Sequence, residues 1–453
     1  MSDWPGRLLH FIGIGGAGMS GLALVCDELG ATVTGSDRAD SSYMERLRVA
    51  GLKPLLGHDA ANLPEGAEVV VSTAIAGDNP ELRLARERGL HICHRGELLA
   101  ELCTEKRLIA IAGTHGKTTS TAMLAWALRG LGENPAFFVG GEVKGLGPEG
   151  GSANAGWGDG GWVVAEADES DASFLDLKPE IAVVTNIEMD HHSHWGSLAE
   201  LTAAFTRFIE PAVGAALPAA AKLPPSRAGE AMQPTDVLCR EAAAAKRVVR
   251  FDEGEPGPAQ LSLRVPGDHN LRNARAALAA VELAGLDVAK AAVELADFPG
   301  VGRRLEHKGL CDGAEIYDDY AHHPTEVRAA LGALRGMEPA RLIAAFQPHL
   351  YSRTKALAEQ FGAALALADE VVVLDVYPAR EEPVGELAGV SGLDVARAAA
   401  DRMGGRRVLW APALEQARAA LASRLEPGAV LVTIGAGDVF RLGEALVGDG
   451  AQG

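Results

Sequence analysis

The feature that most constrains this sequence is a glycine turn between an apolar run and a helical segment, within residues 108–130. Leu108–Ala112 is typical of a strand, residues 113–116 of a turn, and the segment from Lys117 onward of a helix. Glycines let backbone N–H groups surround an anion, the helix N-terminus adds the positive end of its dipole, and the lysine adds a full charge. Thr118 offers a hydroxyl to Mg²⁺. We therefore expect a phosphate-binding loop, although Ile111 stands where the general G-x-x-x-x-G-K-[ST] pattern has its first glycine.

Length and charge narrow the class of protein. With 453 residues the chain is long enough for about three domains of ordinary size. A net charge of −19 argues against a broad nucleic-acid or anionic-membrane surface, so positive charge for an anionic ligand has to be local. The sequence shows no basic leader and no apolar run of the roughly 20 residues that a membrane span needs. Because the five cysteines include no C-x-x-C pair, we expect free thiols and a cytoplasmic protein.

Residues 7–103 alternate short apolar runs with amphipathic segments, which predicts a doubly wound α/β unit. The turn at residues 13–18 fits G-x-G-x-x-G, and Asp37 follows at the end of the next strand. This pattern suits a pyrophosphate and a ribose hydroxyl, which a nicotinamide or flavin dinucleotide and a UDP-sugar share, while glycines alone can serve tight strand–helix packing. The expected strands are Leu8–Ile14, Thr32–Gly35 and Val69–Ser72, and the expected helices are Met19–Leu29, Tyr43–Ala50 and Pro80–Arg88.

Acidic residues and histidines follow two further expected strands. Trp162–Ala165 leads into four carboxylates within residues 166–171, and Ile181–Thr185 leads into a segment, residues 186–194, that contains three histidines. Oxygen ligands suit Mg²⁺, so we favour a metal bound together with ATP. A zinc site at the histidines and a solvated acidic turn are the alternatives. The glycine-rich residues 140–161 are expected to form a loop.

The rest of the chain carries fewer recognisable motifs. Residues 211–266 are rich in alanine and proline, so we expect loops and edge structure there. Asn270 and Asn273 lie one turn apart at the start of a helix expected over Leu271–Ala284, where they could bind a ligand or, for Asn270, cap the helix. The glycine/proline break at residues 298–306 suits an interdomain hinge, and its arginines have no partner within their own segment.

After this break the strand–helix alternation returns, which predicts a third sheet. Three of its strands end in polar clusters at residues 318–324, 347–353 and 435–438, and such clusters at the carboxyl ends of parallel strands are expected to form one rim. The expected strands are Glu315–Tyr317, Leu342–Phe346, Val371–Leu374, Arg407–Leu409 and Val430–Ile434.

Nine short segments, in order, resemble the Mur ligases: HFIGIGGAGMSG, STAIAGDNPE, GTHGKTT, EADESDASFL, TNIEMDH, HN at 269–270, GVGRRLE, DDYAHHPTEV and FQPHLYSRT. They span nearly the whole chain, and EADESDASFL with TNIEMDH is similar to the branch of the family that adds L-alanine. The resemblance implies an α/β fold of three domains, each built on a mainly parallel sheet with flanking helices. It implies a Rossmann-like UDP-sugar domain over residues 1–105, a P-loop ATPase domain over 106–301, and a Rossmann-like amino-acid domain over 302–453.

The resemblance also implies a reaction. ATP would phosphorylate the carboxylate of UDP-N-acetylmuramate, and the amine of L-alanine would attack the acyl phosphate, with Mg²⁺ as cofactor and with ADP and phosphate released. Phosphoryl transfer needs mainly positioning and charge neutralisation, which these residues can supply. No nucleic-acid or membrane partner is expected, and the protein would be a monomer or weak homodimer.

Three alternatives differ in chemistry. A peptide-recycling Mur ligase would attach a preformed peptide to the same sugar. An NAD-dependent oxidoreductase would rest on residues 13–18 and Asp37 alone, and would leave Lys117 and Glu166 without a role. A nucleotide-sensing module would bind ATP without catalysis.

By the same resemblance, the catalytic residues are Lys117, His191, Glu166 and Arg304. Thr118 and Glu166 would hold one Mg²⁺, and Glu166 with His191 a second. The ATP-binding residues would be Gly113, Thr114, His115, Gly116, Lys117, Thr118, Thr119, Asn270, Asn273 and Arg304. The substrate-binding residues would be Gly15, Gly16, Gly18, Met19, Asp37, Ser72, Thr73, Ala74, Asn186, His322, His349 and Arg353.

The sequence departs from the family pattern at four places. Leu350 replaces an arginine, Ala321 replaces a glycine, and residues 192–195 differ from the usual continuation. Residues 211–266 match the family poorly, so the central sheet is expected to lack edge strands. None of these changes removes an expected phosphate or metal ligand.

Overall fold

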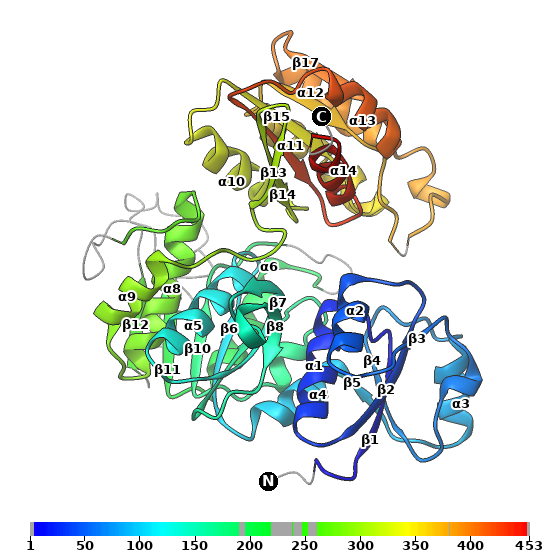
Figure 1. Cartoon of the computed structure of the whole chain (residues 1–453), viewed down its shortest axis with the longest axis vertical. Helices are drawn as coiled ribbons and strands as arrows, with labels where there is room; N and C mark the ends of the chain where they lie inside the picture. The colour runs from blue at the N-terminus through cyan, green and yellow to red at the C-terminus, as the bar shows by residue number, and fades with distance from the viewer. Residues whose placement is uncertain are drawn as a thin grey trace. The chain divides into compact units, whose positions relative to one another are not determined.

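The computed structural model describes residues 4–189, 195–218, 238, 247–251, 261–379 and 381–450 (Figure 1). In these residues the strands form three sheets of five, seven and six strands, with helices between them. The expected three-domain α/β fold with mainly parallel sheets is therefore confirmed. The chain divides into two compact units, residues 1–264 with 271–299 and residues 265–270 with 300–453.

The first sheet of the first unit is wholly parallel, in the order β3-β2-β1-β4-β5. Its chain order reverses between β1 and β4, and a ligand crevice forms at the carboxyl ends of strands where this happens. The strands are β1 (Leu8–Ile12), β2 (Thr32–Asp37), β3 (Leu55–Leu56), β4 (Glu68–Val71) and β5 (Ile92–His94). The helices are α1 (Ala17–Glu28), α2 (Ser42–Val49), η1 (Ala60–Asn62), α3 (Pro80–Glu87) and α4 (Arg95–Cys103).

The second sheet has the order β12-β11-β10-β6-β9-β7-β8, and only β8 is antiparallel to its neighbour. The strands are β6 (Arg107–Ala112), β7 (Ala136–Lys144), β8 (Ser152–Gly156), β9 (Trp162–Glu166), β10 (Ile181–Val184), β11 (Gly214–Pro218) and β12 (Arg247–Phe251).

Two expectations about this sheet were wrong. Residues 140–161 are not one loop, because β7 and β8 pair as a hairpin, with the short helix η2 (Pro148–Gly150) between them. The sheet also does not lack edge strands, since β11 and β12 extend it. Glycines in β7 and β8 obscured the strand pattern in the sequence.

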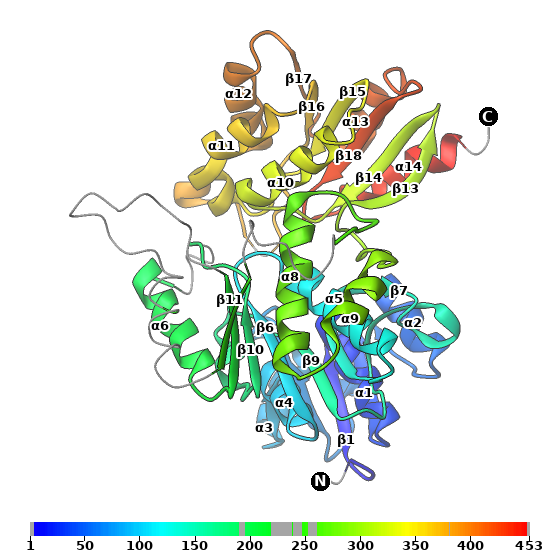
Figure 2. The same ribbon diagram turned by 90° about the vertical axis from the view of Figure 1, so that its left-hand side faces the viewer.

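Helices cover both sheets of the first unit and join them. They include α5 (Lys117–Gly130), η3 (Ser173–Asp176), α6 (Leu198–Ile209), α8 (Asp268–Leu283) and α9 (Val288–Ala296). Helices α5 and α9 pack together (Figure 2). The indole N–H of Trp126 donates to the Glu294 carbonyl at 3.0 Å. Helix α1 packs on β8, where a Cβ at Gly21 would lie 2.9 Å from the Ala155 Cβ. The two sheets consequently share one hydrophobic core.

The second unit holds the third sheet, in the order β13-β14-β18-β15-β16-β17. All its pairs are parallel except β13 with β14. The strands are β13 (Glu306–Cys311), β14 (Ala314–Asp319), β15 (Arg341–Phe346), β16 (Glu370–Val373), β17 (Arg407–Trp410) and β18 (Ala429–Ile434). The helices are α10 (Pro324–Arg335), α11 (Tyr351–Leu365), η4 (Gly385–Leu387), α12 (Gly392–Arg402), α13 (Leu414–Ala422) and α14 (Phe440–Gly450).

The five strands expected in the third sheet are present, and β13 is an addition that its polar sequence did not indicate. Among the described residues no helix is long and apolar enough to cross a membrane. Cys26, Cys93, Cys103 and Cys311 are buried free thiols, as expected, and Cys239 lies outside the described residues.

Candidate active site

The glycine turn after β6 has the geometry of a phosphate loop. Gly113 and Gly116 have φ of 136° and 85°, a region that residues with a Cβ rarely adopt. A side chain at Gly113 would also collide with Thr185, and one at Gly116 with Asn273. Both glycines are therefore required by backbone conformation and by close packing, and α5 begins directly after them, at Lys117.

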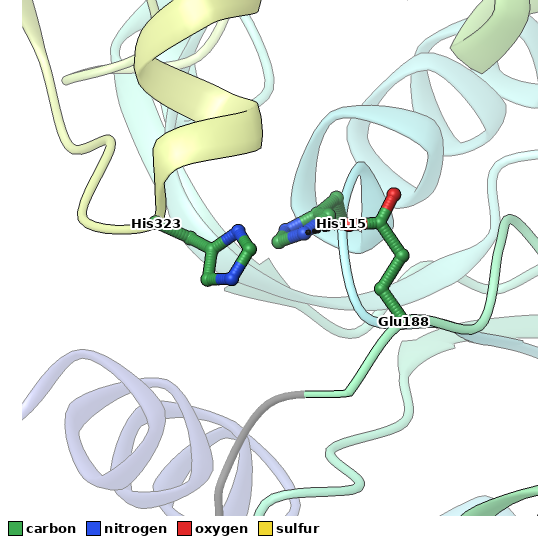
Figure 3. A group of neighbouring side chains, drawn as sticks. All are labelled: His115, Glu188 and His323. Carbon is green, nitrogen blue, oxygen red and sulfur yellow. Dashed lines mark ion pairs between the residues drawn. The ribbon is translucent and has the colours of Figure 1, made fainter. Parts of the chain in front are cut away.

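The loop is fixed by residues that follow β10. Asn186 holds His115 from both ends of its amide: Oδ1 accepts from the His115 N–H at 2.9 Å, and Nδ2 donates to the His115 carbonyl at 2.8 Å. Thr185 donates to the same carbonyl at 2.6 Å. The His115 ring also lies 3.4 Å from the carboxylate of Glu188 (Figure 3). Asn186, expected beside the reacting groups, thus orients the loop through its amide.

Lys117 folds back over the loop that precedes it. Its Nζ donates to the Gly113 carbonyl at 2.6 Å and lies 2.8 Å from Oε2 of Glu169. Burial alone would lower the pKa of Lys117, but the carboxylates of Glu169 and Asp168 raise it. For the Glu169 carboxyl, burial has the opposite effect and raises the pKa to about 7, although the nearby Lys117 ammonium lowers it. The sequence showed Glu169 only as one member of an acidic run, and nothing in it marked this residue as the partner of the lysine.

Thr118 and Glu166 come together as the metal-site expectation requires. The Thr118 hydroxyl donates to Glu166 Oε1 at 2.9 Å, and Oε2 accepts from the Gly140 N–H at 2.7 Å. A Cβ at Gly140 would lie 2.6 Å from that oxygen, so only glycine lets β7 approach the carboxylate. A hydroxyl beside a carboxylate, next to a phosphate loop, is the oxygen donor set that Mg²⁺ prefers, so these residues fit the ion. Thr119 is buried in the same turn of α5.

The turn after β1 forms the second expected ligand site in this unit. Gly13 has φ of 85°, and the Gly15 N–H donates to the Asp37 carboxylate at 2.9 Å. Asp37 therefore supports the turn, from the end of β2, where a ribose contact was expected. The remaining residues of this set lie at the start of α1 or after β4: Gly16, Gly18, Met19, Ser72, Thr73 and Ala74.

Met19 can contribute to binding only through its backbone. Its side chain is buried in the core of the first unit, so it offers a ligand only the backbone N–H in the first turn of α1. Thr73 and Ala74 are exposed just after the carboxyl end of β4, the side on which open parallel sheets bind ligands. The expected substrate contacts of this turn are thus mainly backbone groups.

Asn270 and Asn273 both lie in α8. Asn273 faces the phosphate loop, because a Cβ at Gly116 would run into its amide. Asn270 is buried and donates to the Pro266 carbonyl at 2.7 Å. The helix-cap alternative for Asn270 is wrong, since α8 already begins at Asp268.

In the second unit, His322, His349 and Arg353 gather as expected. The rings of His322 and His349 meet edge to face, with their centroids 6.2 Å apart. Nη1 of Arg353 lies 3.4 Å from Nδ1 of His349. The His349 ring also stacks on the Tyr377 ring, with a centroid distance of 5.9 Å. Leu350, the departure from the family pattern, has φ of 69° and immediately precedes α11. The strand ends thus form a rim with two imidazoles and a guanidinium.

The two arginines after the glycine/proline break have partners within the second unit. Arg303 donates to Asp318 at 3.0 Å, and Nη1 of Arg304 lies 3.8 Å from Glu326. Burial raises the pKa of Asp319, which accepts N–H bonds from Leu305 and Ala321, to about 6. Both of these partners lie outside the arginines' own segment, as expected.

Some predicted residues are not described. His191, assigned to a second metal, lies outside the described residues, as do Asp190, His192 and His194, so the zinc alternative concerns the same undescribed segment. Trp195 is described and buried, and its indole N–H donates to the Glu169 carbonyl at 2.9 Å. The ligand roles of all these site residues stay predictions.

A separate cleft of about 990 Å³ opens at the amino-terminal ends of the strands of the second sheet, where β6 begins. Trp4, Arg107, Trp157 and Glu180 are among the residues that line it. The glycine turn at residues 113–116 follows the opposite end of β6, so this cleft lies away from the expected nucleotide site.

Three models of known protein families match this chain, one in the region of each sheet. Residues 8–107 match the model of the Mur ligase family, catalytic domain, residues 111–221 the Mur ligase middle domain, and residues 303–437 the Mur ligase, glutamate ligase domain. A UDP-N-acetylmuramate–L-alanine ligase of Renibacterium salmoninarum is 43% identical, over 97% of this chain and 95% of that protein. The corresponding ligase of Kineococcus radiotolerans is 44% identical over the same shares of the two chains.

Solved structures agree with these matches. The UDP-N-acetylmuramate-alanine ligase of Thermotoga maritima superposes with a TM-score of 0.82 at 28% identity, over 98% of this chain and 99% of that chain. A murein peptide ligase of Psychrobacter arcticus, with a TM-score of 0.70 at 24% identity and 98% coverage of both chains, shows the same fold. The chain belongs to the Mur ligase family.

Proposed function

We propose that this protein is an ATP-dependent ligase that joins L-alanine to the carboxylate of UDP-N-acetylmuramate, in the synthesis of peptidoglycan precursors. The observation that carries the proposal is the Thr118–Glu166 hydrogen bond of 2.9 Å, directly beside Lys117 at the start of α5. A hydroxyl, a carboxylate and an ammonium on one phosphate loop are the parts that phosphoryl transfer uses. The near full-length similarity to L-alanine ligases supports the choice of substrates.

The chemistry begins with a poor acyl donor. A carboxylate does not react with an amine until one of its oxygens becomes part of a leaving phosphate, so ATP first phosphorylates the muramyl carboxylate. Lys117 neutralises charge on the transferred phosphoryl group, and the N–H groups at the start of α5 orient it. The amine of L-alanine then attacks the acyl carbon, phosphate leaves, and the amine loses a proton. No protein nucleophile is needed.

Mg²⁺ supplies charge neutralisation at the phosphates when it is bound. Thr118 and Glu166 would hold it, and His191 with Glu166 would hold a second ion. The Gly140 N–H keeps the Glu166 carboxylate oriented at 2.7 Å, so its rotamer is set before the ion binds.

We assign the sugar nucleotide to the turn at residues 13–18 and its neighbours at 72–74, and the ATP to the phosphate loop. His322, His349 and Arg353 would contact a substrate carboxylate or phosphate. Arg304 would reach an ATP phosphate. Residues 1–105, 106–301 and 302–453 would then serve the sugar nucleotide, ATP and the amino acid, respectively.

A related activity, attachment of a preformed peptide to the same sugar, is separated by competition. The protein is incubated with ATP, Mg²⁺ and UDP-N-acetylmuramate, together with equal concentrations of L-alanine and the tripeptide L-alanyl-γ-D-glutamyl-meso-diaminopimelate. The expected product, identified by mass spectrometry, is UDP-N-acetylmuramate joined to a single L-alanine and to no other amino acid. A product that carries the tripeptide instead would contradict the proposed amino-acid substrate.

A further inference from the structure

Arg95 is the first residue of α4, at the point where β5 ends. The helix start is tightly specified, because His94 caps the Gly96 N–H at 3.2 Å while the Glu97 carboxylate accepts from the His94 N–H at 2.9 Å. This reciprocal cap fixes the direction in which the backbone leaves β5. Arg95 therefore projects from a rigid position, although no motif in the sequence singled it out.

One side of the Arg95 guanidinium is held by the acidic turn after β9. Nη2 lies 2.7 Å from Oδ2 of Asp168 and 3.5 Å from Oδ2 of Asp171. The turn is itself ordered, since the other oxygen of Asp168 accepts from the Ser170 N–H at 3.0 Å and that of Asp171 from the Ser173 N–H at 3.0 Å. The arginine thus spans from the first sheet to the second within one compact unit.

The other side of the guanidinium lies against the glycine turn after β1. A Cβ at Gly18 would lie 3.3 Å from Nη1 of Arg95, which is tighter than an ordinary contact. Among the described residues, Nε and Nη1 make no hydrogen bond, so two edges of the donor fork remain available. The carboxylates of the acidic turn thus bind only Nη2 of Arg95. Its Nη1 lies beside the glycine turn at residues 13–18.

The same turn presents backbone donors. The first N–H of α1 that bonds to a backbone carbonyl is that of Ser20, to Gly16 at 2.8 Å. The N–H groups of residues 17–19 therefore have no partner within the helix, as is general for a first helical turn. Backbone N–H groups and an arginine fork that converge on one glycine turn form a donor set for anionic oxygen.

We propose that Arg95 binds an anionic oxygen of the sugar nucleotide seated on the turn at residues 13–18, and that Asp168 and Asp171 hold the guanidinium in place. This inference rests on the proposed function, and it adds a substrate-binding residue that lies outside the glycine motif. The oxygen belongs either to the pyrophosphate or to the muramyl carboxylate. The negative charge of Asp168 also acts electrostatically on Lys117. The acidic turn therefore interacts both with Arg95 and with the lysine of the phosphate loop.

The test uses binding of two sugar nucleotides by isothermal titration calorimetry. UDP-N-acetylmuramate carries both pyrophosphate and carboxylate, and UDP-N-acetylglucosamine carries only the pyrophosphate. The variant Arg95→Gln removes the charge. Arg46→Gln is the matched control, since Arg46 also joins the first and second sheets, through Glu142 at 2.6 Å, but its contact lies on α2 and β7.

A lost charge-assisted hydrogen bond should raise the dissociation constant of UDP-N-acetylmuramate for Arg95→Gln at least about tenfold, with Arg46→Gln close to wild type. An equal loss for both ligands assigns the contact to the pyrophosphate, and a loss confined to UDP-N-acetylmuramate assigns it to the carboxylate. Arg95→Lys should recover part of the affinity, because it restores the charge without the fork. Thermal unfolding of each variant checks that the first unit remains folded.

Unchanged affinity of Arg95→Gln, or a loss that Arg46→Gln matches, would overturn the inference while wild-type binding leaves the proposed function standing. If wild-type protein binds neither sugar nucleotide, the proposed function fails and the inference fails with it.

Discussion

Nζ of Lys117 lies 2.8 Å from Oε2 of Glu169, and the two side chains are only 13% and 1% exposed. A buried ammonium and carboxylate neutralise each other at a lower cost than either charge alone. The lysine of the phosphate loop thus has a counter-ion from the acidic turn when no phosphate is present. In the proposed reaction, the triphosphate of ATP would offer the ammonium a second anionic partner.

Replacing Lys117 by alanine should abolish turnover and leave the sugar nucleotide bound. The ammonium stabilises charge that develops on the transferred phosphoryl group, so its loss should lower kcat by at least about a hundredfold. The sugar nucleotide is assigned to the turn at residues 13–18, which belongs to another sheet, so its dissociation constant should not change. Steady-state kinetics and calorimetry measure the two quantities. Loss of both would contradict the assignment of the two ligands to separate sheets.

The Lys117→Ala variant should still fold. Without the ammonium, Glu169 is left as a buried carboxyl, and because burial already raises its pKa to about 7, it can take up a proton near neutral pH. The thermal midpoint of the variant should therefore fall more at pH 8 than at pH 6. A midpoint difference from wild type that is the same at both pH values would show that Glu169 is not the partner that matters.

The Thr118–Glu166 pair predicts the metal dependence of the reaction. Thr118→Val removes one oxygen ligand, and the Mg²⁺ concentration for half-maximal rate should rise at least about tenfold. Thr118→Ser keeps the hydroxyl and serves as the control, with a Mg²⁺ dependence near that of wild type. Titration of activity with Mg²⁺ at saturating substrates measures the effect. If valine and serine variants gave the same curve, Thr118 would not be a ligand.

A buried network under the glycine turn predicts an acid-sensitive stability. Glu81 is fully buried and accepts hydrogen bonds from Ser36 at 2.6 Å and Asn62 at 2.8 Å. Burial alone would raise the pKa of Glu81, but hydrogen bonds from His10, Ser36 and Asn62 lower it to about 2. The Ser36 carbonyl in turn accepts from the Gly13 N–H at 2.8 Å, so the network supports the turn.

Since the pKa of Glu81 is depressed in the folded state, the ionised carboxylate stabilises the protein above pH 4.5. That stability, roughly 3 kcal/mol, should be lost as the pH falls from about 4.5 to about 2. Denaturant unfolding at intervals across this range measures it. Glu81→Gln should be less stable at neutral pH and should show a smaller fall on acidification, whereas Glu45→Gln, at an exposed site paired with Arg48, should follow wild type. Parallel curves for wild type and Glu81→Gln would refute the assignment.

The parts of the site that the sequence predicted are those whose chemistry demands particular residues. Gly113 and Gly116 were recognisable because their backbone conformation excludes a side chain, and Thr118 because a hydroxyl must follow the lysine. Parallel strands placed Glu166 next to them, as expected from the common edge of the sheet.

The parts that escaped prediction depend on burial and on contacts between distant segments. Glu169 and Asp168 look alike in the sequence, yet one pairs with Lys117 and the other with Arg95. The hairpin of β7 and β8 was not predicted because Gly140, a glycine within β7, interrupts the alternation of apolar and polar residues. A glycine is needed there because a Cβ would collide with the Glu166 carboxylate. The burial of the Met19 side chain in the core could likewise not be inferred from a glycine motif, and its role at a ligand stays a prediction.

The most direct test of the proposed ligase reaction is phosphate release from ATP by wild-type protein, measured with each substrate omitted in turn. Release should require ATP, Mg²⁺, UDP-N-acetylmuramate and L-alanine together, and one amide product should form for each phosphate. Phosphate release that is as fast without the sugar nucleotide as with it would contradict the account.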